Sequence, residues 1–320
     1  MNGSGCAPLT AFKALADETR LRLMRLLARY ELNVGEIVSV VDMGQSRISR
    51  HLRILVESGL LEARRDGLWM FYGARESEFL TAVAPLIADC GPEEDLERAR
   101  EALDIRTRET RRFFNSIAPD WQTMRREVLG ELDLDALIVD RLEAGWSMAD
   151  LGCGPGELLA AVAARTAGAS HDAGNGSAWS LIGVDASPAM LELARRKASL
   201  SNASLRMGEL THLPLADAEV RSAVLSLTLH HLSDPLAALR EAQRVIAPGG
   251  RLVVVDYLKH DSELMRLRFG DRWLGFTREE MSGWLSQAGF VVDAIDVKTV
   301  KLGLELVFYQ ARRPLPEEIK

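Results

Sequence analysis

The chain of 320 residues contains few cysteines, and this scarcity excludes several classes of protein. Its three cysteines, Cys6, Cys90 and Cys153, are scattered and form no C-x-x-C spacing. The sequence therefore argues against a disulfide framework and a thiolate zinc site, and it favours a reducing compartment. No run of about 18 apolar residues is present, so we expect no transmembrane helix. Residues 1–5 lack the layout of a signal peptide, so we expect a cytoplasmic protein.

The composition indicates a globular protein of about two domains. Apolar residues make up 47% of the chain and charged residues 27%, which suits a soluble protein with sizeable cores. The formal net charge is −7, but the first 75 residues carry an excess of basic side chains and the remainder an excess of acidic ones. A locally basic segment on an acidic chain indicates an anionic partner for the N-terminal part.

Apolar periodicity predicts a series of short helices in the N-terminal part. We expect them at residues 12–16, 18–30, 34–41 and 45–55, with a turn at residues 42–44. In the last helix Ile48, Leu52 and Leu55 face one way, whereas polar and basic side chains mostly face the other. A short helix, a glycine-containing turn and a helix with such a polar face are typical of a helix-turn-helix.

A predicted hairpin follows this helix-turn-helix. Strands at residues 60–64 and 68–72 flank the dipeptide Asp66-Gly67, which is strongly favoured in hairpin turns. A basic hairpin in this position is a wing. Because helix spacing, turn and wing agree, we interpret the basic face as a surface that binds double-stranded DNA rather than as a merely solvated face. The side chains predicted to reach phosphates or base edges are Gln45, Ser46, Arg47, Ser49, Arg50, His51, Arg53, Arg64 and Arg65.

Two motifs in this region resemble a known family. Residues 15–23 read LADETRLRL and residues 46–52 read SRISRHL. They resemble the ArsR/SmtB winged-helix repressors, over about residues 8–90, and the resemblance implies a homodimer. That family often binds metals through cysteines before the turn, but Asn33 and Gly35 stand there, and residues 76–89 carry no His/Asp ligand set. We therefore expect no metal site. Either the dimer interface or the monomer core contains the apolar residues Phe79, Leu80, Val83, Leu86 and Ile87.

The segment after the winged helix is predicted to be a helical linker. Gly91-Pro92 breaks the chain, and residues 96–114 form a long helix with charges of both signs. Three aromatic residues follow or end this helix: Phe113, Phe114 and Trp121. They either pack against the next domain or form a lid over a ligand. We expect domains at residues 1–90 and 126–320, with the linker at 91–125.

A glycine-rich stretch, residues 149–158, organises the C-terminal part. A short strand at residues 146–148 precedes it and a helix at 158–164 follows, so the glycines join a strand to a helix. Gly152, Gly154 and Gly156 permit a tight turn and a close approach of a ligand. The spacing is D-x-G-x-G-x-G rather than the dinucleotide pattern G-x-G-x-x-G. Asp150 at the strand end suits a ligand with an amine, although the motif alone is also compatible with a simple turn.

Strands and helices alternate after this stretch. A buried strand is predicted at residues 179–185 and ends at Asp185. A carboxylate in this position accepts hydrogen bonds from ribose hydroxyls. Further strands are predicted at residues 204–207, 220–229 and 251–256, and helices at 236–246 and 279–288. A glycine turn at 248–250 closes the first of these helices. We also expect a terminal strand pair at residues 291–297 and 304–311, and a surface loop at residues 167–177 in which His171 has no functional role. The fold class is therefore α/β, with a doubly wound, mostly parallel sheet.

The C-terminal part resembles the class I S-adenosylmethionine-dependent methyltransferases over about residues 113–313. The matching pieces are residues 150–156, Asp185, residues 208–210, residues 229–232 and residues 248–252, and Rossmann-like topology is implied. The resemblance implies that Asp150 and the glycines hold the methionine end, Asp185 the ribose and Glu209 the adenine of S-adenosylmethionine or S-adenosylhomocysteine. The complete set of expected contacts is Asp150, Gly152, Gly154, Gly156, Asp185, Ala186, Met190, Gly208, Glu209, Leu210, Ser226 and Leu227.

The combination of a DNA-binding module with a ligand-binding module indicates a one-component regulator. It resembles the S-adenosylhomocysteine-responsive ArsR-type repressors of the methionine cycle, so we expect a repressor released by that ligand. The alternative is an active small-molecule methyltransferase with a DNA-binding domain, which leaves open whether the chain is an enzyme. His230 or His231 would then either deprotonate an acceptor or merely pack, and we assign no catalytic residue. Because the sulfonium is already activated, methyl transfer needs positioning more than acid–base groups, so the absence of a catalytic triad does not decide between the two functions.

Overall fold

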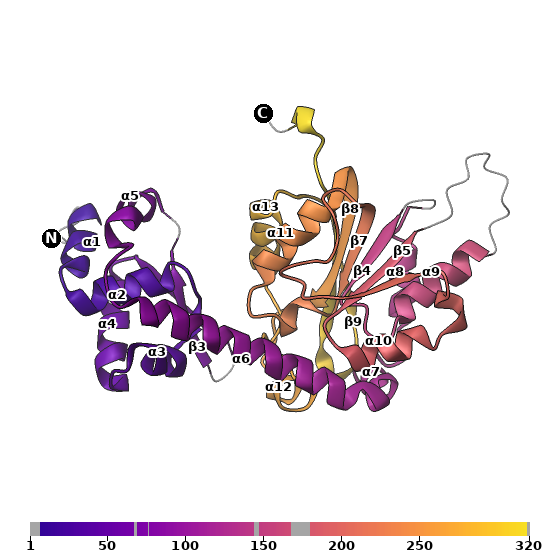
Figure 1. Ribbon diagram of the computed structural model, residues 1–320, viewed down its shortest axis with the longest axis horizontal. Helices are drawn as coiled ribbons and strands as arrows, with labels where there is room; N and C mark the ends of the chain where they lie inside the picture. Colours follow the sequence, from indigo (N-terminus) through magenta and orange to yellow (C-terminus); the bar gives the residue numbers. More distant parts are fainter. Residues whose placement is uncertain (1–6, 67–68, 76, 144–146, 168–179, 319–320) are drawn as a thin grey trace. The chain divides into compact units, whose positions relative to one another are not determined.

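The computed structural model describes residues 7–66, 69–75, 77–143, 147–167 and 180–318 (Figure 1). The chain divides into two compact units, Met1–Arg106 and Thr107–Lys320. The division falls within the long helix α6 (Glu93–Ile117). In the part of the chain that is described, every helix is too short or too polar to cross a membrane.

The first unit is a winged helix-turn-helix. Its elements are α1 (Ala7–Leu15), α2 (Glu18–Leu27), β1 (Leu32–Asn33), α3 (Val34–Val41), α4 (Gln45–Glu57), β2 (Leu61–Asp66), β3 (Trp69–Ala74), α5 (Glu78–Ile87) and the first part of α6. The strands form a small antiparallel sheet in the order β1-β3-β2. The predicted helix-turn-helix and the two strands of the wing are confirmed, whereas the wing's turn residue Gly67 lies outside the described residues.

Local side-chain bonds define where these helices begin. The Asp17 carboxylate accepts the backbone N–H of Arg20 at the start of α2. Asn33 and Glu36 form a reciprocal capping box at the start of α3, with bonds of 2.8 and 3.0 Å. Such caps satisfy N–H groups that have no partner inside the helix. The apolar stripe of α4 is fully buried against the other helices, as its spacing predicts.

The second unit is built on one seven-stranded sheet. Its strands are β4 (Met148–Leu151), β5 (Leu181–Asp185), β6 (Ser204–Met207), β7 (Val220–Ser226), β8 (Ile246–Tyr257), β9 (Val291–Thr299) and β10 (Glu305–Arg312). The order is β6-β5-β4-β7-β8-β10-β9. Strand β10 pairs antiparallel with both β8 and β9, whereas the other neighbouring strands pair in parallel. The mostly parallel, doubly wound sheet that the sequence predicts is confirmed.

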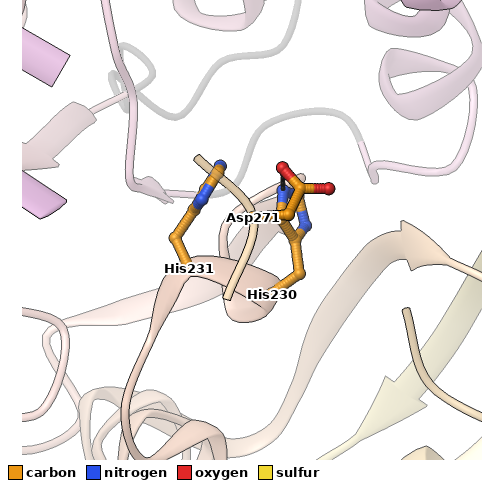
Figure 2. Close-up of side chains that lie close together, drawn as sticks. All are labelled: His230, His231 and Asp271. Atoms are coloured by element: carbon orange, nitrogen blue, oxygen red, sulfur yellow. Dashed lines mark ion pairs between the residues drawn. The ribbon is translucent and has the colours of Figure 1, made fainter. Parts of the chain in front are cut away.

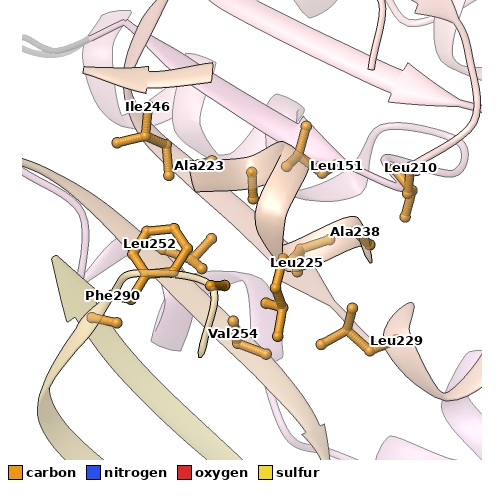
Figure 3. Packing of buried hydrophobic residues seen from close by; sticks show 14 of the residues in the cluster. Leu151, Leu210, Ala223, Leu225, Leu229, Ala238, Ile246, Leu252, Val254 and Phe290 are labelled. Carbon is orange, nitrogen blue, oxygen red and sulfur yellow. The ribbon is translucent and has the colours of Figure 1, made fainter. Parts of the chain in front are cut away.

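Helices cover both faces of this sheet (Figure 1). They are α7 (Trp121–Leu129), α8 (Leu134–Val139), α9 (Glu157–Ala167), α10 (Pro188–Arg195), α11 (Pro235–Val245), α12 (Glu263–Phe269) and α13 (Arg278–Gln287). Side chains of β7 and β8 alternate between two apolar clusters. Ala223, Leu225, Leu252 and Val254 pack with α11 and α13 (Figure 3), whereas Val224 lies in the cluster with α7 to α10.

Several boundaries differ from the sequence-based expectation. The strand expected at residues 146–148 is β4, which extends to Leu151, and Trp146 lies outside the described residues, as does the expected loop with His171. Strand β7 ends at Ser226 rather than residue 229, because Leu227 adopts a left-handed φ of 54°. The glycine turn expected at residues 248–250 lies within β8, where the register shifts by a bulge opposite Val220 and Ser222. Helices α7, α8 and α12 were not predicted.

Candidate functional site

The glycine-rich loop makes a tight turn between β4 and α9. Gly152 has a φ of 87°, and a Cβ atom there would lie 2.2 Å from the Thr228 methyl group. The amides of Gly152 and Cys153 both donate to the Val184 carbonyl, at 2.8 and 2.9 Å. Gly154 has a φ of 51°, but a Cβ atom there would meet nothing within 4 Å. The loop therefore packs tightly at its first glycine and faces open space at its second.

A pocket lies next to this open space, at the carboxyl ends of four parallel strands. Its wall contains residues that directly follow β4, β5, β6 and β7. Strand β4 is the point where the order of the sheet reverses, because β5 lies on one side of it and β7 on the other. Open α/β sheets bind their ligands at this switch point. All residues of the pocket wall belong to the second unit.

Most residues predicted to hold the ligand meet in this pocket. Ten of the twelve line its wall: Asp150, Gly152, Gly154, Asp185, Ala186, Met190, Glu209, Leu210, Ser226 and Leu227. Gly156 and Gly208 do not. A Cβ atom at Gly156 would lie 2.7 Å from Leu200, and one at Gly208 would lie 2.5 Å from Pro214. These two glycines thus allow close packing behind the pocket.

Two carboxyl groups lie in the pocket wall, those of the buried Asp150 and the half-buried Asp185. Burial raises the pKa of Asp150 well above its usual value, and the nearby charges of Asp135, Asp185 and Glu157 raise it further. Burial also raises the pKa of Asp185, although its oxygens accept the amides of Gly154 and Ser187, each at 2.8 Å. Each carboxylate oxygen can still accept another bond. The pocket is thus suited to a ligand that brings a cationic group and hydroxyl donors.

The sequence analysis missed a second set of wall residues. They come from α6, α7, α8 and the segment after α12: Thr107, Thr110, Arg111, Arg125, Leu134, Asp135 and Arg272. No motif marks them, because they lie far apart along the chain. The aromatic residues near the linker were a partial signal. Phe114 and Trp121 do line the pocket, with ring centroids 6.1 Å apart, whereas Phe113 packs against Gly270.

His230 and His231 are neighbours in the short 3₁₀ turn η3 (Leu229–His231) (Figure 2). Burial alone would lower the pKa of His230, but the carboxylates of Asp256 and Asp271 outweigh burial and raise it. Burial and the neighbouring His230 hold the pKa of His231 well below its usual value. His231 lines the pocket and makes an edge contact with Phe114, at a centroid distance of 4.7 Å.

The predicted DNA contacts divide into two groups in the first unit. On α4 the side chains of Gln45, Ser46, Arg47, Arg50 and Arg53 are exposed, as is Arg65 on β2, whereas Ser49 is half-buried. Exposed basic side chains on one helix and one wing strand form a surface that matches the phosphates of a duplex.

Two further basic residues of the set, Arg64 and His51, are less exposed and lie against acidic side chains of the unit. Arg64 donates two bonds of 3.0 Å to the Glu31 carboxylate, and its guanidinium lies 4.9 Å from the centre of the Phe71 ring. His51 is largely buried, with its Nδ1 3.6 Å from the Asp17 carboxylate. Their role in DNA binding stays a prediction, and it would require these contacts to be exchanged or shared.

Comparisons with known proteins agree with both halves of the architecture. The family described as bacterial regulatory protein, arsR family, matches residues 17–63, and the methyltransferase domain family matches residues 149–254. The arsenical resistance operon repressor of Escherichia coli (strain K12) is 46% identical over 83 residues, which are 26% of this chain and 69% of that protein.

Relatives of the second half are more distant. The demethylmenaquinone methyltransferase of Mycobacterium sp. (strain KMS) is 33% identical over 159 residues, which are 50% of this chain and 64% of that protein. The crystal structure of the 4+2 cyclase SpnF has a TM-score of 0.52 at 19% identity, and it covers 64% of this chain and 95% of that chain. This last likeness shows the fold alone. The chain spans 41% to 69% of the length of four curated relatives that it matches, the two named above included.

Fold, surface and matches together define a regulator-type DNA-binding domain joined to a methyltransferase domain. The chain belongs to the arsR family of bacterial regulatory proteins.

Proposed function

We propose that the protein is a one-component transcriptional regulator whose methyltransferase-like domain binds S-adenosylhomocysteine or S-adenosylmethionine. It would act in the cytoplasm as a homodimer on an operator, and repress genes of the methionine cycle until the ligand, S-adenosylhomocysteine in the first instance, releases it. The proposal joins the arsR-family membership to the chemistry of the pocket.

The pocket's charges fit this class of ligand. Both ligands carry an ammonium group and a ribose, which match the carboxylates of Asp150 and Asp185. The open space at Gly154 admits a ligand against the loop backbone. A metalloid signal fits less well, because Asn33 and Gly35 at the start of α3 offer no thiolate.

The observation that carries the proposal is the continuity of helix α6. Its C-terminal part supplies Thr107, Thr110, Arg111 and Phe114 to the pocket wall. Its N-terminal part belongs to the first unit, where Leu96 and other side chains of α6 are buried in the winged-helix core. A ligand that changes the position or order of the pocket end therefore acts on an element that also belongs to the DNA-binding core.

Within the first unit, α6 contacts both ends of α3, the helix that precedes the turn. Arg106 forms an ion pair with Glu36, which also completes the capping box at the start of α3. At the other end Arg98 donates to the Val40 carbonyl at 3.2 Å. Arg22 bridges Asp95 of α6, at 2.6 Å, and the Val41 carbonyl, at 2.9 Å. A shift of α6 is thereby transmitted to the helix-turn-helix.

The required energy is modest. A tenfold change in DNA affinity needs a coupling free energy of about 1.4 kcal/mol, which lies within the usual range for allosteric proteins. That amount is comparable with the net contribution of one hydrogen bond to a charged group. The ligand must bind the DNA-competent and DNA-incompetent states differently by this amount.

The decisive experiment measures binding of an operator fragment by fluorescence anisotropy, titrated separately with the two ligands. We expect S-adenosylhomocysteine to change the DNA affinity at least tenfold, and Arg50→Ala to weaken DNA binding without changing ligand affinity. Arg108→Ala is the matched control, because Arg108 is an exposed arginine outside α4. If both ligands bind and neither changes DNA affinity, the regulator proposal is wrong, and a screen for methyl acceptors becomes the next step.

A further inference from the structure

Three side chains that can ligate a metal meet next to the pocket (Figure 2). His230 and His231 come from the turn after β7, and Asp271 comes from the segment after α12. All three are buried, and one ligand atom of each lies within 4.8 Å of those of the other two. The two segments are about 40 residues apart in sequence, so only the fold brings these side chains together.

Both imidazoles are held through their Nδ1 atoms. Nδ1 of His230 lies 2.7 Å from an oxygen of the Asp256 carboxylate, and Nδ1 of His231 lies 3.1 Å from the Gly270 carbonyl. A neutral imidazole that donates its Nδ1–H carries its lone pair on Nε2. Metal-binding histidines are almost always oriented by such a bond to a carboxylate or a carbonyl. In their neutral forms, both histidines with these bonds would therefore present the lone pair of Nε2, which a metal requires.

One separation within the cluster is also compatible with a shared ion. Nε2 of His230 lies 3.5 Å from Oδ1 of Asp271. A proton shared by these two atoms would draw them to about 2.8 Å. Two ligands of one tetrahedral ion, each at roughly 2.1 Å from it, lie about 3.4 Å apart. The observed separation is close to the one expected of two ligands of one ion, and the same two atoms form an ion pair when His230 is protonated.

We propose that His230, His231 and Asp271 bind one divalent first-row transition-metal ion. Two imidazole nitrogens and one carboxylate oxygen suit Zn²⁺ and its neighbours in that row, whereas Ca²⁺ and Mg²⁺ prefer shells of oxygen ligands. Because His231 also lines the pocket, the ion lies at the pocket wall. Three protein ligands leave a position for water or for an atom of the bound molecule.

No cysteine pair and no ligand set on the winged-helix elements indicates a metal site in the sequence. The pair His230-His231 was considered only as a base or as packing residues. Asp271 has no local motif. The proposal concerns a site within the second unit and does not depend on the regulator function proposed above.

The test measures metal binding directly. Tag-free full-length protein is stripped with EDTA, dialysed, and titrated with Zn²⁺ in competition with a chromophoric chelator, and Co²⁺ absorption reports the coordination geometry. We expect one equivalent to bind, with a Co²⁺ spectrum typical of four or five ligands. If the wild-type protein binds no Zn²⁺ in this competition, the cluster holds only a proton and the proposal is overturned, whatever the variants do.

Variants then assign the ligands. Asp271→Asn and His231→Gln should each weaken Zn²⁺ binding at least tenfold, and Asp256→Asn, which removes the charged partner of His230, should weaken it by about 10- to 100-fold. His212→Gln is the matched control, because His212 is exposed and outside the cluster. Circular dichroism verifies that each variant folds. Wild-type affinity in folded Asp271→Asn and His231→Gln proteins would place the bound ion elsewhere and contradict the proposal.

Discussion

Two glycines of the same loop serve different purposes at the scale of single residues. A Cβ atom at Gly154 would enter open space, whereas one at Gly152 would collide with Thr228. We expect Gly154→Ala to lower S-adenosylhomocysteine affinity at least tenfold while costing about 1–2 kcal/mol of stability for its left-handed backbone. Gly152→Ala should cost about 2–4 kcal/mol, since overpacking adds to the same strain.

Calorimetric ligand titration and thermal unfolding separate the two effects. Gly283→Ala is the control, because Gly283 lies inside α13 with open space around its Cα. That substitution should stabilise the protein by about 0.5–1 kcal/mol and leave ligand affinity unchanged. Equal ligand affinities for the wild-type protein and Gly154→Ala would show that the ligand does not approach the loop there.

Asp150 gives the pocket a pH dependence with a definite sign. Its pKa in the folded protein lies well above its usual value of 3.8, mainly because it is buried. At pH values between about 4 and the folded pKa, the folded state holds a proton on Asp150 that the unfolded state has lost. The contribution of Asp150 to stability therefore falls as pH rises through this range. Asp150→Asn should thus stabilise the ligand-free protein at neutral pH and weaken ligand binding. The gain should vanish near pH 4 in thermal unfolding measured as a function of pH. A gain of equal size at all pH values would refute this explanation.

At the scale of elements, sequence and structure agree best where an apolar pattern coincides with a local boundary signal, such as the Asn33 cap before α3 or the glycine-containing turn before α4. Helices α3 and α4 have both an apolar stripe and clear boundaries, and they were predicted to within two residues. The short helices α7, α8 and α12 have no such signal, because packing against the sheet rather than propensity forms them. The same difference decides which residues of the pocket wall the sequence predicts. Its wall after β4 to β6 follows a motif, whereas Arg125, Asp135 and Arg272 reach it only through tertiary packing.

Helix α6 yields the prediction that belongs to this scale. Asp104 is exposed on α6 near the end of the first unit, three residues before Thr107, the first α6 residue that lines the pocket. Asp104→Pro removes a helical hydrogen bond and kinks the helix, at a cost of about 3 kcal/mol. We expect this variant to retain its separate affinities for DNA and ligand but to lose the effect of one on the other, as measured by anisotropy. Asp104→Ala should keep the effect. An undiminished effect in the proline variant would exclude α6 as the connecting element.

At the scale of the whole molecule, the two units predict two unfolding transitions. Each has its own apolar cores, and the division lies in one helix. In differential scanning calorimetry, S-adenosylhomocysteine at 100 times its dissociation constant should stabilise the second unit by about 2.7 kcal/mol. An operator fragment should raise mainly the transition of the first unit. A single transition that both ligands raise equally would show that the chain unfolds as one cooperative body.

A helix shared by a ligand pocket and a DNA-binding core has a further consequence, which concerns what the operator does to the pocket. Coupling free energy is reciprocal, so the factor by which a ligand changes DNA affinity is also the factor by which DNA changes ligand affinity. Molecules seated on an operator would then respond at a different ligand concentration from molecules free in solution. The fraction of the protein that is bound to operator DNA would therefore influence the ligand concentration at which the regulator responds.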